Sequence, residues 1–263
     1  MALQEVRGVA TKIAVCIKQV PTREWQPRLN DDKTWIREQD VSYEMNEPDA
    51  YALEEALRLR ERHGGEVVVC CAGPARVQQV IREALARGAD RAIHVQDDRL
   101  AAADAFMTAD ALAAAMGDEK FDLVLTGLQS DDLGQAQTGV ILAERLGSPH
   151  STIIMEVQAE GDALRVKREL EGGWFQWITM PLPAVLTIQS GINQLRYATL
   201  KGIMAAKKKE IRTAAMPPDL QPTQQIVSLA VPTRAKTTHM IEGSAGEAAK
   251  DLVRLLREEA RVL

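Results

Sequence analysis

The feature that most constrains the fold is an alternation, over the first 150 residues, of short apolar runs rich in β-branched residues with longer helical patterns. The predicted strands cover residues 12–20, 66–72, 90–95 and 121–126. The predicted helices cover residues 49–63, 75–87, 101–116 and 135–146. Such alternation predicts an α/β fold with a mostly parallel sheet, and the continuous apolar runs predict strands that helices cover on both faces.

The next part of the chain has a different pattern, in which strand-like segments follow one another without helices. These segments cover residues 151–158, 163–170, 174–180 and 184–189. Glycine pairs and prolines separate them, which is typical of hairpins. We therefore expect antiparallel strands added to the parallel sheet.

The end of the chain shows little periodicity apart from a last amphipathic helix at residues 246–262. A tail with one helix cannot form a core of its own. The sequence thus predicts one domain at residues 1–190 and an extended arm at residues 191–263, which packs on this chain or on a partner.

Composition and charge exclude several classes of protein. The 32 Lys and Arg residues against 37 Asp and Glu residues give a net charge of −5, which argues against nucleic-acid binding. No apolar run is as long as a membrane span, which needs about 18 residues. Residues 1–11 contain no apolar run either, so we expect no signal peptide. Cys16, Cys70 and Cys71 are predicted to be buried, reduced thiols of a cytoplasmic protein.

The segment after the fourth predicted strand is the richest in small and polar residues: Gly127-Leu-Gln-Ser-Asp-Asp-Leu-Gly-Gln-Ala-Gln-Thr-Gly139. It lies between the carboxyl end of a strand and the start of a helix, where open α/β sheets bind ligands. Backbone N–H groups, with the Ser130 and Thr138 hydroxyls, could hold a phosphate there. The alternative is an ordinary helix cap provided by Asp131 or Asp132.

Three other residues are expected to border the same crevice. Cys16 lies in the middle of the first predicted strand, Ala72 closes the second, and Asn46 lies at the start of the first helix. Their convergence favours a small nucleotide, because an Asn side chain can read an adenine edge without a charged contact. The alternative for Asn46 is a helix cap.

Catalytic and metal-binding patterns are not found. The four histidines are not paired with a Cys, Ser or acid at a known spacing, and we expect neither a metal site nor a catalytic residue. This favours a module that holds a nucleotide or handles electrons, with the chemistry provided by a cofactor.

A second unusual stretch covers residues 195–209 (LRYATLKGIMAAKKK). Leu200 lies in a short polar context, and Ile203, Met204 and three consecutive lysines follow it. One interpretation is a solvated charge run over a frayed helix. The other is a docking element with an exposed apolar anchor and basic neighbours that attract an acidic partner.

Several segments together resemble the β subunit of electron transfer flavoproteins. They follow the order of that family, at residues 12–21 (KIAVCIKQVP), 45–46 (MN), 49–60 (DAYALEEALRLR), 72–74 (AGP), 88–94 (GADRAIH), 127–139, 182–185 (LPAV) and 198–209 (ATLKGIMAAKKK). The resemblance covers about residues 12–212, and the last segment is similar to the family's signature region.

The resemblance implies a Rossmann-like subunit, of the adenine nucleotide α-hydrolase-like type, that forms a heterodimer with a larger α subunit. The α subunit holds the redox FAD, which carries electrons from flavin dehydrogenases, such as acyl-CoA dehydrogenases, to a quinone-linked oxidoreductase. The β subunit holds a structural AMP in most of the family. The final helix would belong to an arm around the α subunit.

The resemblance also implies the roles of individual residues. The adenosine pocket would be lined by Cys16, Asn46, Glu47, Pro48, Asp49 and Ala72. The loop that completes the pocket and holds the phosphate would be Gly127, Leu128, Gln129, Ser130, Asp131, Asp132, Leu133, Gly134, Gln135, Ala136, Gln137 and Thr138. Leu200, with Ile203 and Met204 beside it, would insert into a hydrophobic pocket of a dehydrogenase.

The loop departs from both patterns known in the family. Members that hold AMP read Asp-Asp-Asp-x-Asn-Gln-Thr-Gly, and electron-bifurcating members, which hold a second FAD and oxidise NADH, read near Asp-Gly-Asp-Thr-Ala-Gln-Val-Gly-Pro. Here Gln137-Thr138-Gly139 resembles the first pattern and Ala136-Gln137 the second. Val140 stands where bifurcating members have Pro, and we favour AMP.

Two further classes stay open from the residues alone. One is a nucleotide-dependent enzyme of the related α/β hydrolase-like fold, which ATP turnover by the isolated chain would support. The other is a scaffold that holds no ligand, which the absence of a released nucleotide would favour.

Overall fold

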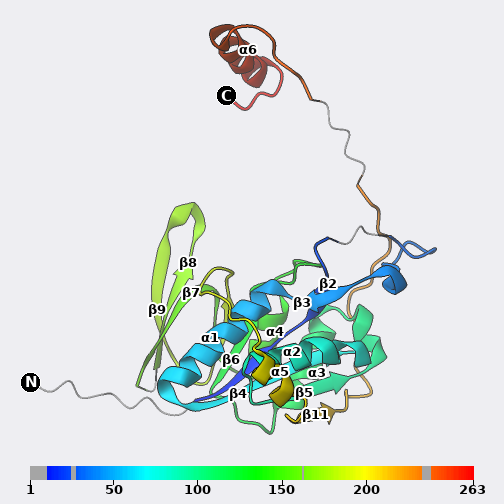
Figure 1. The fold of residues 1–263 in the computed structure, drawn as a ribbon, viewed down its shortest axis with the longest axis vertical. Helices are drawn as coiled ribbons and strands as arrows, with labels where there is room; N and C mark the ends of the chain where they lie inside the picture. Colours follow the sequence, from blue (N-terminus) through cyan, green and yellow to red (C-terminus); the bar gives the residue numbers. More distant parts are fainter. Residues whose placement is uncertain (1–10, 25–27, 162, 233–237) are drawn as a thin grey trace, which may run out of the picture.

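The computed structural model describes residues 11–24, 28–161, 163–232 and 238–263. Residues 1–10, for which the sequence predicts no signal peptide, lie outside this range. Within the described residues, nine strands form one sheet in the order β11-β5-β4-β1-β6-β10-β7-β8-β9, and β2 and β3 form a separate ribbon (Figure 1). This architecture confirms the α/β, Rossmann-like prediction.

The strands from β11 to β7 run parallel to one another. They are β1 (Thr11–Cys16), β4 (Gly65–Gly73), β5 (Arg91–Gln96), β6 (Leu123–Gly127), β10 (Ala184–Ile188), β11 (Ile211–Ala214) and β7 (His150–Glu160). Cys16 lies opposite Cys70 on one side and Thr126 on the other. The carboxyl ends of the central strands therefore reach the same edge of the sheet, where they can share a site.

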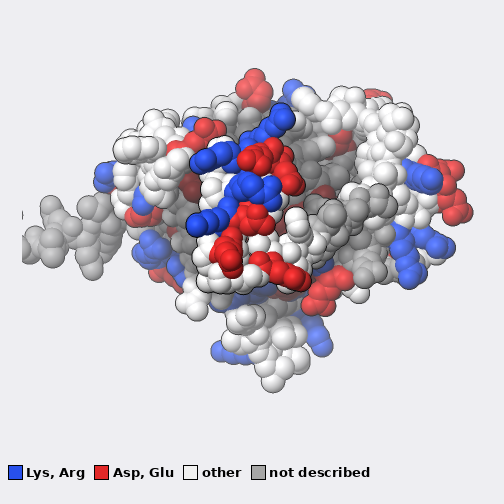
Figure 2. All heavy atoms as spheres, turned by 90° about the horizontal axis from the view of Figure 1, so that it is seen from above, with Lys and Arg blue, Asp and Glu red and all other residues white. Residues whose placement is uncertain are grey.

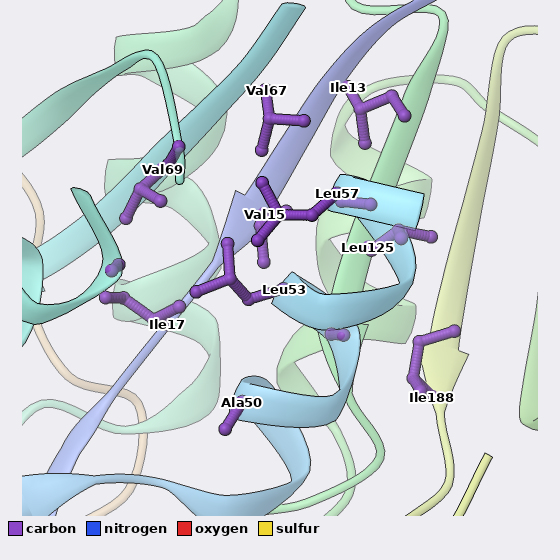
Figure 3. Close-up of a cluster of buried hydrophobic side chains, with 14 of the residues drawn as sticks. Ile13, Val15, Ile17, Ala50, Leu53, Leu57, Val67, Val69, Leu125 and Ile188 are labelled. Carbon is purple, nitrogen blue, oxygen red and sulfur yellow. The ribbon is translucent and has the colours of Figure 1, made fainter. Parts of the chain in front are cut away.

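Helices cover both faces of the sheet, because the side chains of β1 point alternately to each. Ile13 and Val15 belong to one buried cluster, and Ala14 and Cys16 belong to the other. The first face carries α1 (Glu47–His63), α2 (Gln78–Arg87) and α5 (Leu200–Ala206). The second carries α3 (Ala105–Met116) and α4 (Thr138–Arg145). Figure 3 shows Leu53 and Leu57 of α1 packed against β1.

The antiparallel addition is confirmed for three of the four predicted segments. The strands β7, β8 (Ala163–Glu169) and β9 (Phe175–Pro181) pair as consecutive hairpins. The prediction for residues 184–189 is wrong, since β10 lies between β6 and β7 and runs parallel to both. Every residue of β10 is buried, as expected for a strand in the middle of a covered sheet.

The predicted first strand, residues 12–20, is divided in the structure. β1 ends at Cys16, and β2 (Gln19–Pro21) pairs with β3 (Tyr43–Met45) outside the main sheet. Cys16 is thus the last residue of its strand and not a central one. The chain leaves the sheet at Lys18, whose N–H donates to Asp49 instead of a strand.

Three predicted helices begin later than expected. α3 begins at Ala105 because Asp104 caps it, accepting a 2.8 Å bond from the N–H of Met107. α4 begins at Thr138, and α2 follows a short 3₁₀ turn. The 3₁₀ turns are η1 (Glu38–Asp40), η2 (Ala75–Val77), η3 (Asp98–Ala102) and η4 (Glu171–Gly173).

The residues after 190 divide into a packed part and an extended part. β11 pairs with β5 as an edge strand of the main sheet, although the sequence predicts no strand there. Further on, the N–H groups of Thr223 and Gln224 donate to Asp104. The domain boundary at residue 190 stays a prediction, and the described chain leaves the sheet only after residue 214.

The last helix, α6 (Ala245–Glu258), confirms the prediction of a terminal helix and stands apart from the sheet (Figure 1). None of its residues is buried. Figure 2 views the molecule from above and shows Lys and Arg side chains interleaved with Asp and Glu side chains on the face turned to the viewer. Of the helices in the described residues, none combines the length and hydropathy that a bilayer span requires.

Candidate functional site

A pocket opens at the carboxyl ends of β1, β4 and β6, between the loop after β6 and the starts of α1 and α3. The structure brings together here most of the residues that the sequence singles out. Those that line the pocket are Cys16, Asn46, Asp49, Ala72, Gly127, Leu128, Gln129, Ser130, Leu133, Gln135, Ala136, Gln137 and Thr138. Whether they bind a nucleotide stays a prediction.

Five predicted site residues do not line this pocket: Glu47, Pro48, Asp131, Asp132 and Gly134. Glu47 and Asp131 share the cation Arg23, and Asp132 pairs with Lys18 at 2.7 Å. Pro48 packs against Gly127, where an added Cβ would lie 2.7 Å from the Pro48 Cβ. Gly134 closes a turn by donating to the Ser130 carbonyl at 2.8 Å. Glu47 and Pro48 thus contact this loop from α1, and Asp131, Asp132 and Gly134 belong to the loop but do not line the pocket.

Asn46 occupies the N-cap position of α1, but its side chain makes no cap bond. Its Nδ2 donates to the Gln129 carbonyl at 3.0 Å, and its Oδ1 accepts from the Asp131 N–H at 2.9 Å. The side chain is 1% exposed. Asn46 therefore joins the start of α1 to the loop after β6 and fixes the backbone of that loop.

Asp49 performs the corresponding task one turn further along α1. Its Oδ1 accepts from the Gly127 N–H at 2.9 Å and its Oδ2 from the Lys18 N–H at 2.8 Å. Burial raises the pKa of this carboxyl to about 7, although the two backbone hydrogen bonds, Asn46 and Lys18 oppose the rise. Asp49 thus ties together the ends of β1 and β6 at the floor of the pocket.

The start of α4 faces the pocket without a side-chain cap. Its N-cap residue is Gln137, which makes no side-chain bond, and Thr138 and Gly139 line the pocket. Neither Asp131 nor Asp132 serves as the cap. A Cβ on Gly139 would lie 2.6 Å from Thr126 Oγ1, so only glycine lets the helix approach the sheet here. The free N–H groups carry the positive end of the helix dipole.

The sequence interpretation missed Lys18, the one cation among the residues that line this pocket. Its Nζ lies 2.7 Å from Asp132 Oδ1 and 3.4 Å from Ser130 Oγ. It also missed Ile17 and Thr126, and the wall at the start of α3, contributed by Ala103, Asp104, Ala105, Thr108 and Leu112. A lysine directly after a buried apolar strand is the signal that could have found Lys18.

The thiols of the chain, of which only Cys16 lines the pocket, are not poised for nucleophilic chemistry. Cys16, Cys70 and Cys71 are buried and free. Burial raises the pKa of Cys16 well above its ordinary value and that of Cys70 to about 12. The described residues contain no group of three His, Cys, Asp or Glu side chains that could hold a metal ion.

The residues predicted to dock a partner lie on α5, away from the pocket-lining residues. Leu200 is 78% exposed, Met204 57% and Ile203 45%. Thr199 caps the helix, accepting a 3.0 Å bond from the Gly202 N–H. The segment is therefore an ordered helix with apolar side chains in solvent, and its docking role stays a prediction.

Comparison with known proteins gives a consistent result. The family model for the electron transfer flavoprotein domain matches residues 33–219. The electron transfer flavoprotein subunit β of Methylophilus methylotrophus is 36% identical over 261 residues, which cover 94% of this chain and 98% of that protein. The human protein of the same name is 37% identical over 260 residues, with 95% and 98% coverage. The chain therefore belongs to the family of electron transfer flavoprotein β subunits.

Proposed function

We propose that this chain pairs with an electron transfer flavoprotein α subunit and that the heterodimer carries electrons from flavin dehydrogenases, such as acyl-CoA dehydrogenases, to a quinone-linked acceptor. Family membership over most of the chain carries this proposal. FAD, held mainly by the α subunit at the interface, would supply the redox chemistry. The task of this chain is to hold a nucleotide and to present surfaces to partners. The three buried, reduced thiols are consistent with a cytoplasmic location.

We propose that the pocket at the strand ends holds a small anionic nucleotide, AMP. The uncapped start of α4, the Ser130 and Thr138 hydroxyls and the Lys18 ammonium group offer donors for a phosphate. Apolar lining from Leu112, Leu128 and Ala72 offers a surface for a base. Asn46 and Asp49 hold the loop in the shape that brings these groups together.

A second FAD is the alternative occupant, and one observation favours it. A neighbouring pocket of about 430 Å³ shares Lys18, Ala103 and Leu133 with the first. A ligand longer than AMP could extend into it, as an electron-bifurcating protein that oxidises NADH would require. The Gln137-Thr138-Gly139 sequence and Val140 support AMP.

The test is coexpression of the chain with a candidate α subunit, followed by release of the bound cofactors and measurement of their number in each heterodimer. We expect one FAD and one AMP in each heterodimer. Two FAD and no AMP would establish the alternative. A chain that is stable alone, shows no affinity for an α subunit and turns over ATP would instead indicate a nucleotide-dependent enzyme. A chain without any nucleotide would indicate a scaffold.

A matched pair of variants tests whether AMP binds in this pocket. Asn46→Ala removes both bonds to the loop, so AMP content should fall while FAD content is retained. Asn30→Ala is the control, because Asn30 binds Thr34 and Trp35 in another loop through the same kinds of bond. Equal AMP content in both variants would contradict the assignment.

A further inference from the structure

The helix α5 exposes three large apolar side chains although it has only seven residues. A helix this short is not stable by itself in water. On its other side the helix packs against α2, because Ala206 is buried and an added Cβ on Gly202 would overlap the Ala86 carbonyl oxygen. The arrangement of Leu200, Ile203 and Met204 therefore depends on this packing and on the bonds on either side of the helix.

After α5, the chain is fastened to α2. Arg82 donates from Nη1 to the carbonyls of Ala206 at 2.6 Å and Lys209 at 2.9 Å. Lys209 donates from Nζ to the Leu85 carbonyl at 3.0 Å. These bonds satisfy carbonyls at the helix C-terminus and fix that end in space.

Before α5, the chain is fastened to α1 by Arg196. Its Nε and Nη2 lie 2.7 and 3.1 Å from the two carboxylate oxygens of Glu54. Its Nη1 and Nη2 lie 2.5 and 3.1 Å from those of Glu61, two turns along the same helix. One guanidinium group thus makes paired bonds to two carboxylates.

Glu54 gives this attachment a firm base, because its side chain is only 5% exposed. Burial by itself raises the pKa of Glu54, but hydrogen bonds from Arg196 and Arg58 outweigh burial and hold the pKa below its ordinary value. The Glu54 carboxylate is therefore charged, and the guanidinium groups of Arg196 and Arg58 stabilise this charge. Arg58 also donates to the Gln194 carbonyl at 3.0 Å, so the chain before Arg196 is held as well.

We propose that Arg196 is a positioning residue for partner docking: bound to Glu54 and Glu61, it fixes the start of α5 so that Leu200, Ile203 and Met204 meet a flavin dehydrogenase in one arrangement. The inference rests on the proposed function, which supplies the partner. The guanidinium group is occupied by α1, so Arg196 acts through the helix that follows it.

The experiment uses the complex with the α subunit and an acyl-CoA dehydrogenase reduced by its acyl-CoA. Arg196→Met should speed amide hydrogen exchange at residues 197–206 and raise the KM for the dehydrogenase by about tenfold, the loss expected when one or two side chains must be ordered on binding. The kcat and the FAD content should stay unchanged. Arg196→Lys should restore only part of the effect, because an ammonium group cannot make paired bonds to both carboxylates.

Arg145→Met is the matched control, since Arg145 pairs with Asp110 on the other face of the sheet. It should change neither the exchange nor the KM. If Arg196→Met yields no folded complex, Glu61→Gln keeps the bonds to Glu54 and should give the same changes with smaller amplitude. If Arg196→Met folds, wild-type exchange and a wild-type KM in that variant would overturn the proposal. If it does not fold, the same result in Glu61→Gln would overturn it.

Leu200→Ala separates this inference from the proposed function. A wild-type KM in that variant would reject docking through α5. The exchange measurement would still decide whether Arg196 orders the helix.

Discussion

The pocket at the strand ends and the surface of α5 are built in opposite ways. At the pocket, polar side chains are buried: Asn46 is 1% and Asp49 6% exposed. Asn46 binds backbone groups of the loop after β6, and Asp49 binds backbone groups at the ends of β1 and β6. At α5, apolar side chains lie in solvent, and charged side chains hold the backbone beneath them. The first arrangement makes a cavity of fixed shape, and the second makes a fixed protrusion.

This difference separates stability from recognition. A buried polar side chain that loses its partners costs free energy of unfolding, because the groups left behind stay buried and unpaired. An exposed apolar side chain contributes little to folding, and a cluster of such side chains is typical of an interaction surface. Substitutions in the two regions should therefore act on different measurements.

The largest expected effect is that of Gly127→Ala. The added Cβ would overlap Asp49 Oδ1 and lie 2.8 Å from the Asp49 N atom, so the chain must shift where α1 and β6 meet. We expect the free energy of unfolding to fall by about 3 kcal/mol, measured by chemical denaturation of the complex. Gly246→Ala is the control, because an added Cβ there meets nothing within 4 Å. If both variants lost the same free energy of unfolding, the close contact at Gly127 would not explain the effect.

A smaller loss, which depends on pH, is expected for Asp49→Asn. The amide can accept from only one of the two N–H groups, so we expect a loss of about 2 kcal/mol at pH 5. The pKa of Asp49 is about 7 when folded, against 3.8 ordinarily, so the folded state binds more protons between these values. Its contribution is complete below about pH 4 and is lost as the pH rises through 7.

The Asn variant does not titrate at this position, so its deficit should narrow as the pH rises from 5 to 8. Denaturation at a series of pH values measures the difference. Wild-type and variant curves that stay parallel would show that Asp49 is not the titrating group.

The smallest expected effect on stability is that of Leu200→Ser. Since this side chain is 78% exposed, we expect a change below about 0.5 kcal/mol in the free energy of unfolding. Leu53→Ala, at a fully buried position of α1, should cost about 3 kcal/mol. A large destabilisation by Leu200→Ser would mean that the Leu200 side chain contributes to folding despite its exposure.

The sequence predicted the parallel part of the sheet well, because its strands are long apolar runs that alternate with helices. It failed at β10, where the turn residues on either side resemble those of a hairpin although every residue of the strand is buried. It missed β11, whose four residues include only two that are apolar. Neither the order of strands nor such a short strand can be read from local periodicity, because both depend on contacts made far along the chain.

The candidate site was predicted in part for the same reason. Motif residues near strand ends were brought together as expected, whereas the wall from α3 was missed, since nothing local shows that Asp104 and Thr108 face the loop after β6. The support given by Asp49 was not visible either. It depends on amides 31 and 78 residues away in the sequence.

Asp104 has a consequence of its own. One carboxylate caps α3 with Oδ1, binds Thr223 and Gln224 of the extended segment with Oδ2, and lies in the wall of the pocket. A ligand that strengthened these bonds would stabilise the attachment of that segment by some free energy. By linkage, the attached segment would then stabilise ligand binding by the same free energy. Only a ligand that acts on Asp104 would link the pocket to residues 223–224 in this way.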